Sequence, residues 1–304
     1  MPEVPSFPEF KSIELGDRSV FTRILKEYQP ETSEWTFTNL FIWRDHYRFR
    51  WSVYGNLLII TGEQDGTGAY VMQPMGPPPR RDTALTVLKW LRKEEGVSLP
   101  TIERVDAQMI EELHGAPGLF IEPTHDHYDY VYLRDDLVQL AGNKYRTKRN
   151  RINRITRNHS FTFEPLEERH LEACLELQSN WCEVRRSEED LSLLGEWGAI
   201  QEAMENFEAL GLQGGVITIG GKVKAFSVGE MLNDATAVIH IEKANPEISE
   251  LYTIINQRCA QECWNVRYIN REQDLGIPGL REAKLSYHPH HMAPKYRVTL
   301  TGFE

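Results

Sequence analysis

Residues 214–244 read GGVITIGGKVKAFSVGEMLNDATAVIHIEKA and contain three runs rich in β-branched and aromatic residues. Such runs, bounded by glycine and asparagine, are typical of β-strands. Only a Gly-Gly-Lys link and an Asn-Asp link separate them, and links this short join neighbouring antiparallel strands. The sequence therefore predicts a three-stranded antiparallel meander in the second half of the chain.

Further helices and strands surround this meander. Two helices are expected before it, and a helix, a strand, a short helix and a final strand are expected after it. These segments are 167–182, 197–210, 248–263, 266–272, the helix that opens near Pro278, and 295–300. The final strand is expected to complete this same half of the chain.

The first half shows a similar succession. Helical spacing is present over 17–29, 33–47 and 80–96, and strand patterns occur over 48–54, 56–63 and 69–76. A chain of 304 residues also exceeds the usual size of a single core. The sequence predicts an α+β fold with two domains, 1–125 and 126–304, each a mixed, mainly antiparallel sheet flanked by helices.

The composition is that of a folded globular protein, with 40% hydrophobic and 26% charged residues and a net charge of −11. The N-terminus has no cationic start followed by an apolar core, and no apolar run approaches the roughly 20 residues that span a bilayer. The cysteines lack paired C-x-x-C spacing. We therefore expect a cytoplasmic protein with no transmembrane segment and no disulfide framework.

One stretch runs against the acidic average. Residues 143–158 read NKYRTKRNRINRITRN and contain no carboxylate. On a helix, Tyr145, Ile152 and Ile155 share one apolar stripe, and cations cover most of the remaining circumference. Like charges three and four residues apart repel, so anions are expected to offset them. Their source is either carboxylates elsewhere in the chain or a bound polyanion, such as polyphosphate, a nucleic acid backbone or an anionic lipid headgroup.

The order of these segments resembles that of known enzymes. The strand YDYVYLRDDLVQLAG, followed by the basic run from Lys144 to Arg151 and its continuation NRINRITRN, is similar to the inter-domain segment of bacterial FemABX-type aminoacyltransferases. The segments NFEALGLQGGVITIGGKVKAFSVGEMLNDATAVIHIEKA and YINREQDLGIPGLREAKLSYHPHHMAPKY resemble the family built on the catalytic, C-terminal domain of phosphatidylglycerol lysyltransferases. The resemblance implies two tandem GNAT-like acyltransferase folds with a basic seam helix near 143–158.

For characterised relatives, the resemblance implies transfer of an amino acid from aminoacyl-tRNA to an amine or a lipid hydroxyl. The membrane-spanning region of the full-length lipid transferases is absent from this sequence, which weighs against lipid modification, while peripheral contact with anionic lipid stays compatible. Those enzymes tend to show K-x-K-F-x-P near the C-terminus. This chain has Lys284, Leu285, Ser286, Tyr287 and Pro289, so a serine replaces the second lysine.

The sequence of one turn helps to choose between aminoacyl-tRNA and acyl-CoA as the acyl donor. Acetyltransferases of the same fold bind the pyrophosphate of acetyl-CoA with a glycine-rich loop that leads into a helix. The corresponding turn here, KANPEISELY at 243–252, has no glycine, so side chains hinder close approach of a phosphate. We expect aminoacyl-tRNA as the donor, acyl-CoA as the weaker alternative, no bound cofactor, and a small molecule or peptide as the acceptor.

Acyl transfer needs a base for the nucleophile and a group that stabilises charge on the carbonyl oxygen. Strand alternation puts Val238, His240 and Glu242 on one face. His240 and Glu242 are therefore candidate catalytic residues that share a cleft, and a satisfied hydrogen-bond pair in the core is the alternative. The loop segment NREQDLG, 270–276, adds Asp274 as a third catalytic candidate.

Residues beside that loop are candidates for substrate binding. Arg271 can hold a phosphate or carboxylate bidentately, and its alternative is a salt bridge to Glu272 or Asp274. Lys284 and Tyr287 lie three apart on the predicted short helix and can face the same cleft. The predicted substrate-binding set is Asn270, Arg271, Lys284 and Tyr287. The predicted anion-binding or tRNA-binding set is Lys144, Arg146, Lys148, Arg149, Arg151 and Arg154.

Histidines cluster at 125–127 and 288–291, but neither cluster has a recognised zinc-ligand spacing, so no metal site is expected. The predicted function is aminoacyl transfer from aminoacyl-tRNA to an amine or hydroxyl. Two alternatives stay open: an acyl-CoA-dependent N-acyltransferase, and a non-catalytic module that binds RNA or anionic lipid. A polar pair of His240 and Glu242 beside a cleft favours an enzyme, whereas internal hydrogen bonds that fill both side chains favour the module.

Overall fold

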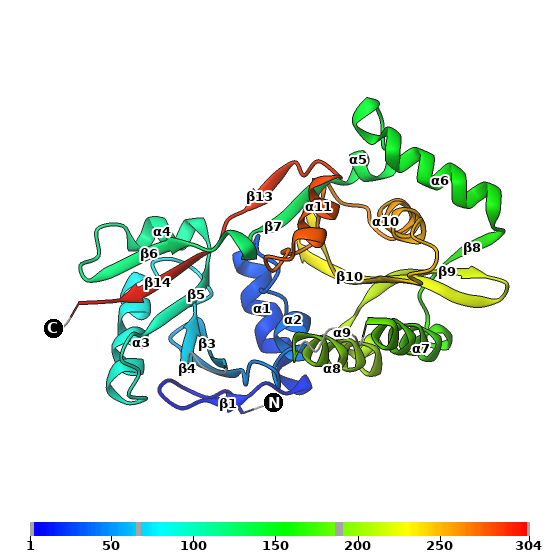
Figure 1. Cartoon of the computed structure of the whole chain (residues 1–304). Helices are drawn as coiled ribbons and strands as arrows, with labels where there is room; N and C mark the ends of the chain where they lie inside the picture. The colour runs from blue at the N-terminus through cyan, green and yellow to red at the C-terminus, as the bar shows by residue number, and fades with distance from the viewer. Residues whose placement is uncertain (1–2, 65–67, 186–190, 303–304) are drawn as a thin grey trace. The chain divides into compact units, whose positions relative to one another are not determined.

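The computed structural model describes residues 3–64, 68–185 and 191–302. The chain forms two compact units (Figure 1). The first comprises Met1–Asp129, Gln273–Pro278 and Met292–Glu304, and the second comprises Tyr130–Glu272 and Gly279–His291. Among the described residues, each unit contains one mixed sheet of seven strands. The predicted α+β class, with mixed and mainly antiparallel sheets flanked by helices, is confirmed.

The first sheet has the strand order β1-β2-β3-β4-β5-β14-β6. Its strands are β1 (Lys11–Ser12), β2 (Arg50–Tyr54), β3 (Leu57–Gln64), β4 (Gly68–Met72), β5 (Thr101–Val105), β14 (Tyr296–Leu300) and β6 (Leu119–Pro123). A two-residue turn joins β2 to β3, and its Gly55 has a φ of 65°, a left-handed value that glycine adopts without strain. β4 and β5 are parallel, which makes the sheet mixed.

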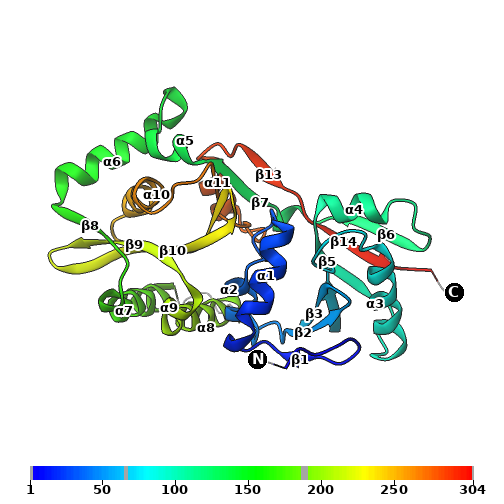
Figure 2. The same cartoon turned by 180° about the vertical axis from the view of Figure 1, so that it is seen from behind.

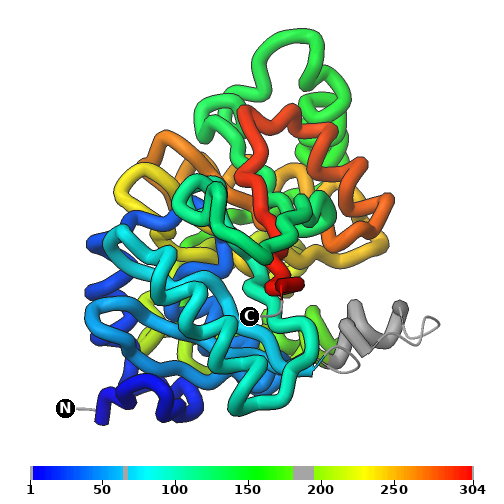
Figure 3. Tube along the Cα trace, turned by 90° about the vertical axis from the view of Figure 1, so that its left-hand side faces the viewer, coloured from blue at the N-terminus to red at the C-terminus, as the bar shows by residue number. Residues whose placement is uncertain are grey.

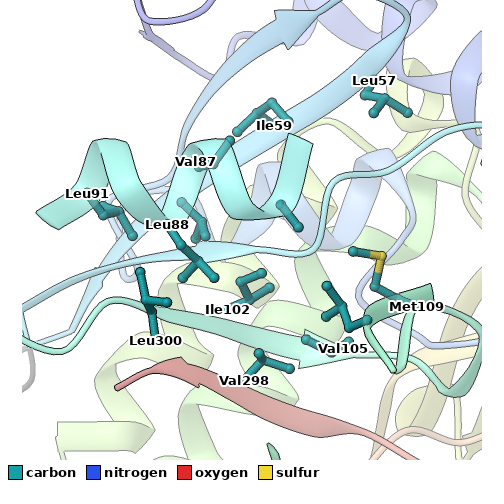
Figure 4. Close-up of a cluster of buried hydrophobic side chains, with 13 residues drawn as sticks. Leu57, Ile59, Val87, Leu88, Leu91, Ile102, Val105, Met109, Val298 and Leu300 are labelled. Carbon is teal, nitrogen blue, oxygen red and sulfur yellow. The ribbon is translucent and has the colours of Figure 1, made fainter. Parts of the chain in front are cut away.

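Helices cover this sheet and close its core. They are α1 (Arg18–Tyr28), α2 (Phe37–Ile42), α3 (Arg81–Lys93) and α4 (Ala107–Leu113). α4 begins at Asp106, whose side chain accepts a hydrogen bond of 2.7 Å from the backbone N–H of Met109. Figure 4 shows Leu88 of α3 among the buried side chains of the strands, including Ile102 and Val298.

The last strand, β14, belongs to the first sheet. It lies between β5 and β6 and is antiparallel to both, with Val298 opposite Ile102 on one side and Ile121 on the other. Figure 3 shows this C-terminal segment in red beside segments coloured cyan to green. The expectation that 295–300 completes the second half is therefore wrong, because pairing between strands distant in sequence leaves no local pattern.

The second sheet has the strand order β13-β7-β12-β11-β10-β9-β8. Its strands are β13 (His291–Ala293), β7 (Asp129–Leu133), β12 (Tyr268–Asn270), β11 (Thr236–Ala244), β10 (Lys222–Asn233), β9 (Gln213–Ile219) and β8 (Phe161–Pro165). β9, β10 and β11 are consecutive and antiparallel, so the predicted meander is confirmed. β11 and β12 are parallel, and the segment between them contains a helix.

Helices lie on both faces of the second sheet. They are α5 (Arg134–Gln139), α6 (Arg146–Asn158), α7 (Glu168–Arg185), α8 (Leu191–Glu205), α9 (Phe207–Leu210), α10 (Leu251–Glu262) and α11 (Pro278–Leu285). In Figures 1 and 2, α10 covers one face and α7 and α8 cover the other. The basic stretch forms α6, and its Ile155 packs against Ile254 and Ile255 of α10.

Candidate functional site

A β-bulge interrupts the pairing of β10 with β11. Val228 pairs with Ile241, and the next residue, Gly229, pairs with Ile239. β11 therefore carries one extra residue, His240, opposite an uninterrupted stretch of β10. Bulges re-aim side chains and are enriched beside active sites.

This bulge changes which residues share a face. Ser227 is paired with Glu242, and Glu230 is paired with Val238. Ser227 and Glu230 are three apart on β10, so they lie on opposite faces of the sheet, and so do their partners. The expectation that residues 238, 240 and 242 share one face is wrong, because a single extra residue shifts the alternation.

Two carboxylates enclose His240. Its Nε2 lies 3.0 Å from Oε1 of Glu230, its Nδ1 lies 2.8 Å from Oε1 of Glu272, and its side chain is 3% exposed. Burial lowers the pKa of His240, but the hydrogen bonds to the two carboxylates outweigh burial and raise the pKa to about 9. The ring is therefore an imidazolium at neutral pH, with both N–H groups donating. It has no lone pair to accept a proton, and it orients Glu272.

Glu242 anchors Arg271. Its Oε1 accepts a hydrogen bond of 2.8 Å from Nη2 of Arg271, and its Oε2 accepts one of 3.2 Å from Nδ2 of Asn256 on α10. Arg271 thus forms an ion pair, but with Glu242 and not with Glu272 or Asp274, the partners named in the alternative interpretation. Within the described part of the chain, Nη1 of Arg271 and Oδ1 of Asn256 are buried and have no hydrogen-bond partner. Buried polar groups are nearly always paired, so both atoms are candidates for contact with a ligand.

Lys284 fixes the loop that carries Arg271. Its Nζ donates hydrogen bonds of 2.5 Å and 3.0 Å to the carbonyl oxygens of Arg271 and Glu272. Glu272 has a φ of 56°, and Oδ1 of Asn270 accepts a hydrogen bond of 2.8 Å from its backbone N–H. Asn270 and Lys284 thus hold the backbone of Arg271 and Glu272. Both were predicted to bind substrate, and the structure gives them contacts that position the loop.

Asp274 belongs to a different compact unit from Arg271 and Glu272. It belongs to Gln273–Pro278, which groups with the first unit. Its buried carboxylate accepts a hydrogen bond of 2.8 Å from the backbone N–H of Gly276. This contact is that of an Asx turn, in which a carboxylate shapes the local backbone.

Tyr287 brings Arg271 together with a lysine from α6. The guanidinium of Arg271 lies 4.9 Å from the centroid of the Tyr287 ring, and Nζ of Lys148 lies 3.5 Å from the same centroid. Nζ of Lys148 also donates a hydrogen bond of 2.7 Å to Oγ of Ser286. We call Glu242, Asn256, Arg271, Tyr287, Lys148 and Ser286 the Arg271 cluster.

The sequence placed Lys148 among the cations that meet an anion at the surface, but its side chain is buried and 6% exposed. The sequence does contain a signal for the burial of this side chain. Lys148 is three residues from Tyr145, four from Ile152 and seven from Ile155, so it falls on the apolar stripe of the helix. Asn256 and Ser286 have no such signal, because only the packing of α10 and α11 brings them near Arg271.

The other cations of residues 143–158, of which Lys144 lies just before α6, divide into two groups. Lys144 pairs with Asp136 at 3.4 Å, Arg154 pairs with Glu250, and Arg149 donates hydrogen bonds to the carbonyl oxygens of Leu140 and Gly142. Arg146, Arg151 and Arg157 are exposed. An open groove of about 480 Å³ lies along the helix, lined by Gln139, Arg146, Arg149, Asn150, Ile152, Asn153 and Gln257. Carboxylates of the chain therefore neutralise part of the positive charge of this basic stretch, while Arg146, Arg151 and Arg157 are exposed to solvent.

A second buried charge cluster lies in the first unit. Nζ of Lys295 is fully buried and lies 2.6 Å from Oε1 of Glu34 and 2.6 Å from Oδ1 of Asp129. Oγ of Ser33 donates a further hydrogen bond of 2.9 Å to Asp129. Burial raises the pKa of Glu34, while the ammonium of Lys295 opposes that rise. The ammonium thus pairs with two buried carboxylates, which is the pattern of a structural ion network, while Oε2 of Glu34 is buried without a hydrogen-bond partner in the described part of the chain.

No group of three or more His, Cys, Asp or Glu side chains able to hold a metal ion is present in residues 3–64, 68–185 and 191–302. None of the helices in that part of the chain is both long and apolar enough to cross a membrane.

Solved structures define the class of fold. FemX aligns over 97% of this chain and 97% of its own, with 9% identity and a TM-score of 0.59. A tandem GNAT protein from the clavulanic acid biosynthesis pathway aligns over 97% of this chain and 99% of its own, with 10% identity and a TM-score of 0.51. The two units are therefore tandem GNAT-like folds, as the resemblance implied.

Within that class, the chain belongs to the family defined by the C-terminal region of phosphatidylglycerol lysyltransferases, whose sequence pattern matches residues 25–299. The structure of L-PGS from Bacillus licheniformis is similar, with 15% identity, a TM-score of 0.67, and coverage of 100% of this chain and 95% of that one. A conserved protein of unknown function from Bacteroides thetaiotaomicron VPI-5482 is 32% identical, with a TM-score of 0.89 and coverage of 96% and 99%. Compared by sequence with curated proteins, the chain has no match.

Proposed function

We propose that this protein transfers an aminoacyl group from aminoacyl-tRNA to an amine or hydroxyl acceptor, and that the Arg271 cluster is the site of transfer. The observation that carries the proposal is the buried Nη1 of Arg271, a cationic hydrogen-bond donor without a partner in the described residues. Leaving a buried donor unpaired costs about 1–3 kcal/mol, and a bound oxygen would recover that free energy. Membership in the lysyltransferase family supports an aminoacyl group as the ligand.

The geometry suits the charge that develops in acyl transfer. When the acceptor attacks the ester carbonyl, negative charge collects on the carbonyl oxygen. Nη2 of Arg271 is held by Glu242, so Nη1 keeps a fixed direction and can donate to that oxygen. The side chain of Asn256 is held by the other oxygen of Glu242, so its free Oδ1 can accept from the amino group of the aminoacyl moiety.

The exposed cations of α6 fit the same donor. Arg146, Arg151 and Arg157 stand on the helix that also carries Lys148 into the cluster. A tRNA acceptor end is a chain of phosphates that such side chains can neutralise. We propose that these arginines hold the phosphates while the terminal ester reaches Arg271. Anionic lipid headgroups carry the same phosphate chemistry and are the alternative ligand of these three residues.

Coenzyme A remains the weaker alternative as donor. The turn before α10, where related folds bind pyrophosphate, uses its amides internally: the N–H of Glu247 donates to Oδ1 of Asn245 and that of Ile248 donates to the carbonyl oxygen of Asn245. A pyrophosphate would have to displace these hydrogen bonds. This observation, together with the missing glycine, weighs against an acyl-CoA transferase.

One observation favours a second candidate function. Both ring nitrogens of His240 and both carboxylate oxygens of Glu242 form internal hydrogen bonds, which is the arrangement expected of a non-catalytic binding module. In the proposed enzyme these two residues position Glu272 and Arg271, and the chemistry falls to other groups. In the module, RNA would bind to α6 without any transfer.

The test is a donor screen with the natural chain. Total tRNA charged with radiolabelled amino acids is incubated with the protein and with three acceptor pools: small amines, peptides, and phosphatidylglycerol vesicles. We expect one aminoacyl-tRNA to lose label to one pool faster than without protein, and radiolabelled acetyl-CoA to lose none. Transfer from acetyl-CoA alone would establish the acyl-CoA alternative. Binding of tRNA without transfer from either donor would establish the binding module.

A further inference from the structure

Lys148 differs from every other cation of α6 that the structure describes, because its side chain enters the Arg271 cluster. Nζ lies 2.7 Å from Oγ of Ser286 and 3.5 Å from the centroid of the Tyr287 ring. Arg271 contacts the same ring at 4.9 Å. The amine and the free guanidinium nitrogen therefore belong to one site, although they come from different parts of the chain.

We propose that Lys148 is the proton-accepting catalytic residue of this site, which takes the proton of the attacking acceptor and passes it to the leaving oxygen. The inference rests on the proposed function and adds the group that the transfer still lacks. His240 cannot fill this role, since both of its ring nitrogens donate to carboxylates.

The hydrogen bonds of Lys148 leave the lone pair of its neutral amine available to accept a proton. Oγ of Ser286 donates its own hydrogen to the carbonyl oxygen of Ala283 at 2.6 Å, so toward Lys148 it acts as an acceptor. One N–H of a neutral amine is then used on Ser286, and a second can point at the face of the Tyr287 ring. The lone pair of Nζ is not consumed by either contact.

The charges around Lys148 favour the neutral amine. Burial is the largest cause that lowers the pKa of Lys148, and the positive charges of Arg271 and Arg151 lower it further. Glu242 acts in the opposite direction, but its carboxylate is already paired with Arg271. The pKa falls to about 7, so a large fraction of the amine can accept a proton at neutral pH.

The proposed step balances without another reactant. The acceptor nitrogen or oxygen forms a bond to the ester carbonyl carbon, and its proton moves to Nζ of Lys148. The bond between that carbon and the ribose oxygen then breaks, and the ribose oxygen takes the proton from Nζ. Lys148 ends neutral, and Arg271 donates to the carbonyl oxygen throughout.

Ser286 offers a matched rescue. Its Oγ is 2.7 Å from Nζ of Lys148. An amine supplied from position 286 would therefore reach the point that the amine at position 148 occupies. The double exchange Lys148→Ser with Ser286→Lys keeps the composition of the site and reverses the direction from which the amine enters.

The experiment compares the natural chain with Lys148→Arg, with the double exchange, and with Arg169→Gln as an exposed control, all using the donor and acceptor found in the screen. Lys148→Arg keeps a hydrogen bond to Ser286 and a positive charge but cannot accept a proton. General-base catalysis contributes about 10²- to 10⁴-fold, so we expect Lys148→Arg to lower kcat at least about 100-fold and to abolish the rise of kcat/KM with pH near 7. The double exchange should restore a measurable part of the activity.

A second measurement does not depend on turnover. NMR of protein labelled with ¹³C at lysine Cε, assigned with Lys148→Arg, should show one lysine that titrates near 7. A Lys148 titration above 9, or Lys148→Arg activity within about threefold of the natural chain, overturns the inference and leaves the proposed function standing. If the natural chain transfers no aminoacyl group, the proposed function itself fails, and with it the catalytic role of Lys148.

Discussion

The exposed arginines of α6 lead to a prediction that separates ligand contacts from internal ion pairs. Changing Arg146, Arg151 and Arg157 together to Gln removes three cations that face solvent. If each arginine contacts one phosphate, the three together contribute about −2 to −3 to the slope of log tRNA affinity against log salt concentration, at −0.7 to −0.9 per phosphate. Between 50 and 200 mM salt, that slope corresponds to a roughly 20- to 40-fold loss of tRNA affinity.

The control uses two cations of the basic stretch 143–158 that already have partners, Lys144 just before α6 and Arg154 within it. Lys144→Gln with Arg154→Gln removes the pairs with Asp136 and Glu250. Fluorescence anisotropy of labelled tRNA at four salt concentrations, with all proteins checked by thermal unfolding, measures both slopes. We expect the triple variant to bind more weakly with a flatter slope, and the control variant to keep most of the natural slope. Equal affinities and slopes for the natural chain and the triple variant would refute the assignment of α6 as a phosphate-binding helix.

Two further predictions concern stability. Lys295→Met should lower the free energy of unfolding by about 3–5 kcal/mol, because it removes the cation that pairs with the buried carboxylates of Asp129 and Glu34 and leaves Glu34 with the longer contact of 3.4 Å to Arg104. Lys93→Met, at an 83% exposed side chain, is the control, and denaturant unfolding that gives equal values for both would contradict the network. His240 has a folded pKa raised from 6.5 to about 9, so its stabilisation is complete below pH 6.5 and is lost as pH rises through about 9. Denaturant unfolding from pH 6 to 10 should show this loss in the natural chain and less of it in His240→Gln; identical pH profiles would argue against an imidazolium.

Local patterns in the sequence were sufficient to predict the antiparallel meander and the basic helix of the second unit. The meander of β9, β10 and β11 follows from β-branched runs with short polar links, and α6 follows from the spacing of Tyr145, Ile152 and Ile155. The placement of β14 could not be predicted in this way, because its partners β5 and β6 lie more than 170 residues earlier in the chain. Its own residues would suit either sheet.

The structure brings several of the residues singled out from the sequence close together, and their roles stay predictions. His240, Glu242, Arg271, Lys284 and Tyr287 do lie in one connected region of the second unit. The bulge at His240 could not be predicted, because consecutive residues of β11 are buried and the strand shows no alternation of polar and apolar residues that an extra residue would visibly break. The burial of Lys148 was missed because a lysine on an apolar stripe was counted by its charge and not by its position.

The central claim is that Arg271 stabilises charge on the carbonyl oxygen, and single-turnover transfer by Arg271→Gln tests it most directly. Arg169→Gln, an exposed arginine of the second unit paired with Glu164, is the matched control. Removing one such donor lowers the rate by about 10²- to 10³-fold, so we predict a fall of that size in the rate of transfer from bound aminoacyl-tRNA, measured with donor at saturation because the variant also loses the binding contact of Arg271. A rate for folded Arg271→Gln within about threefold of the control would contradict the claim.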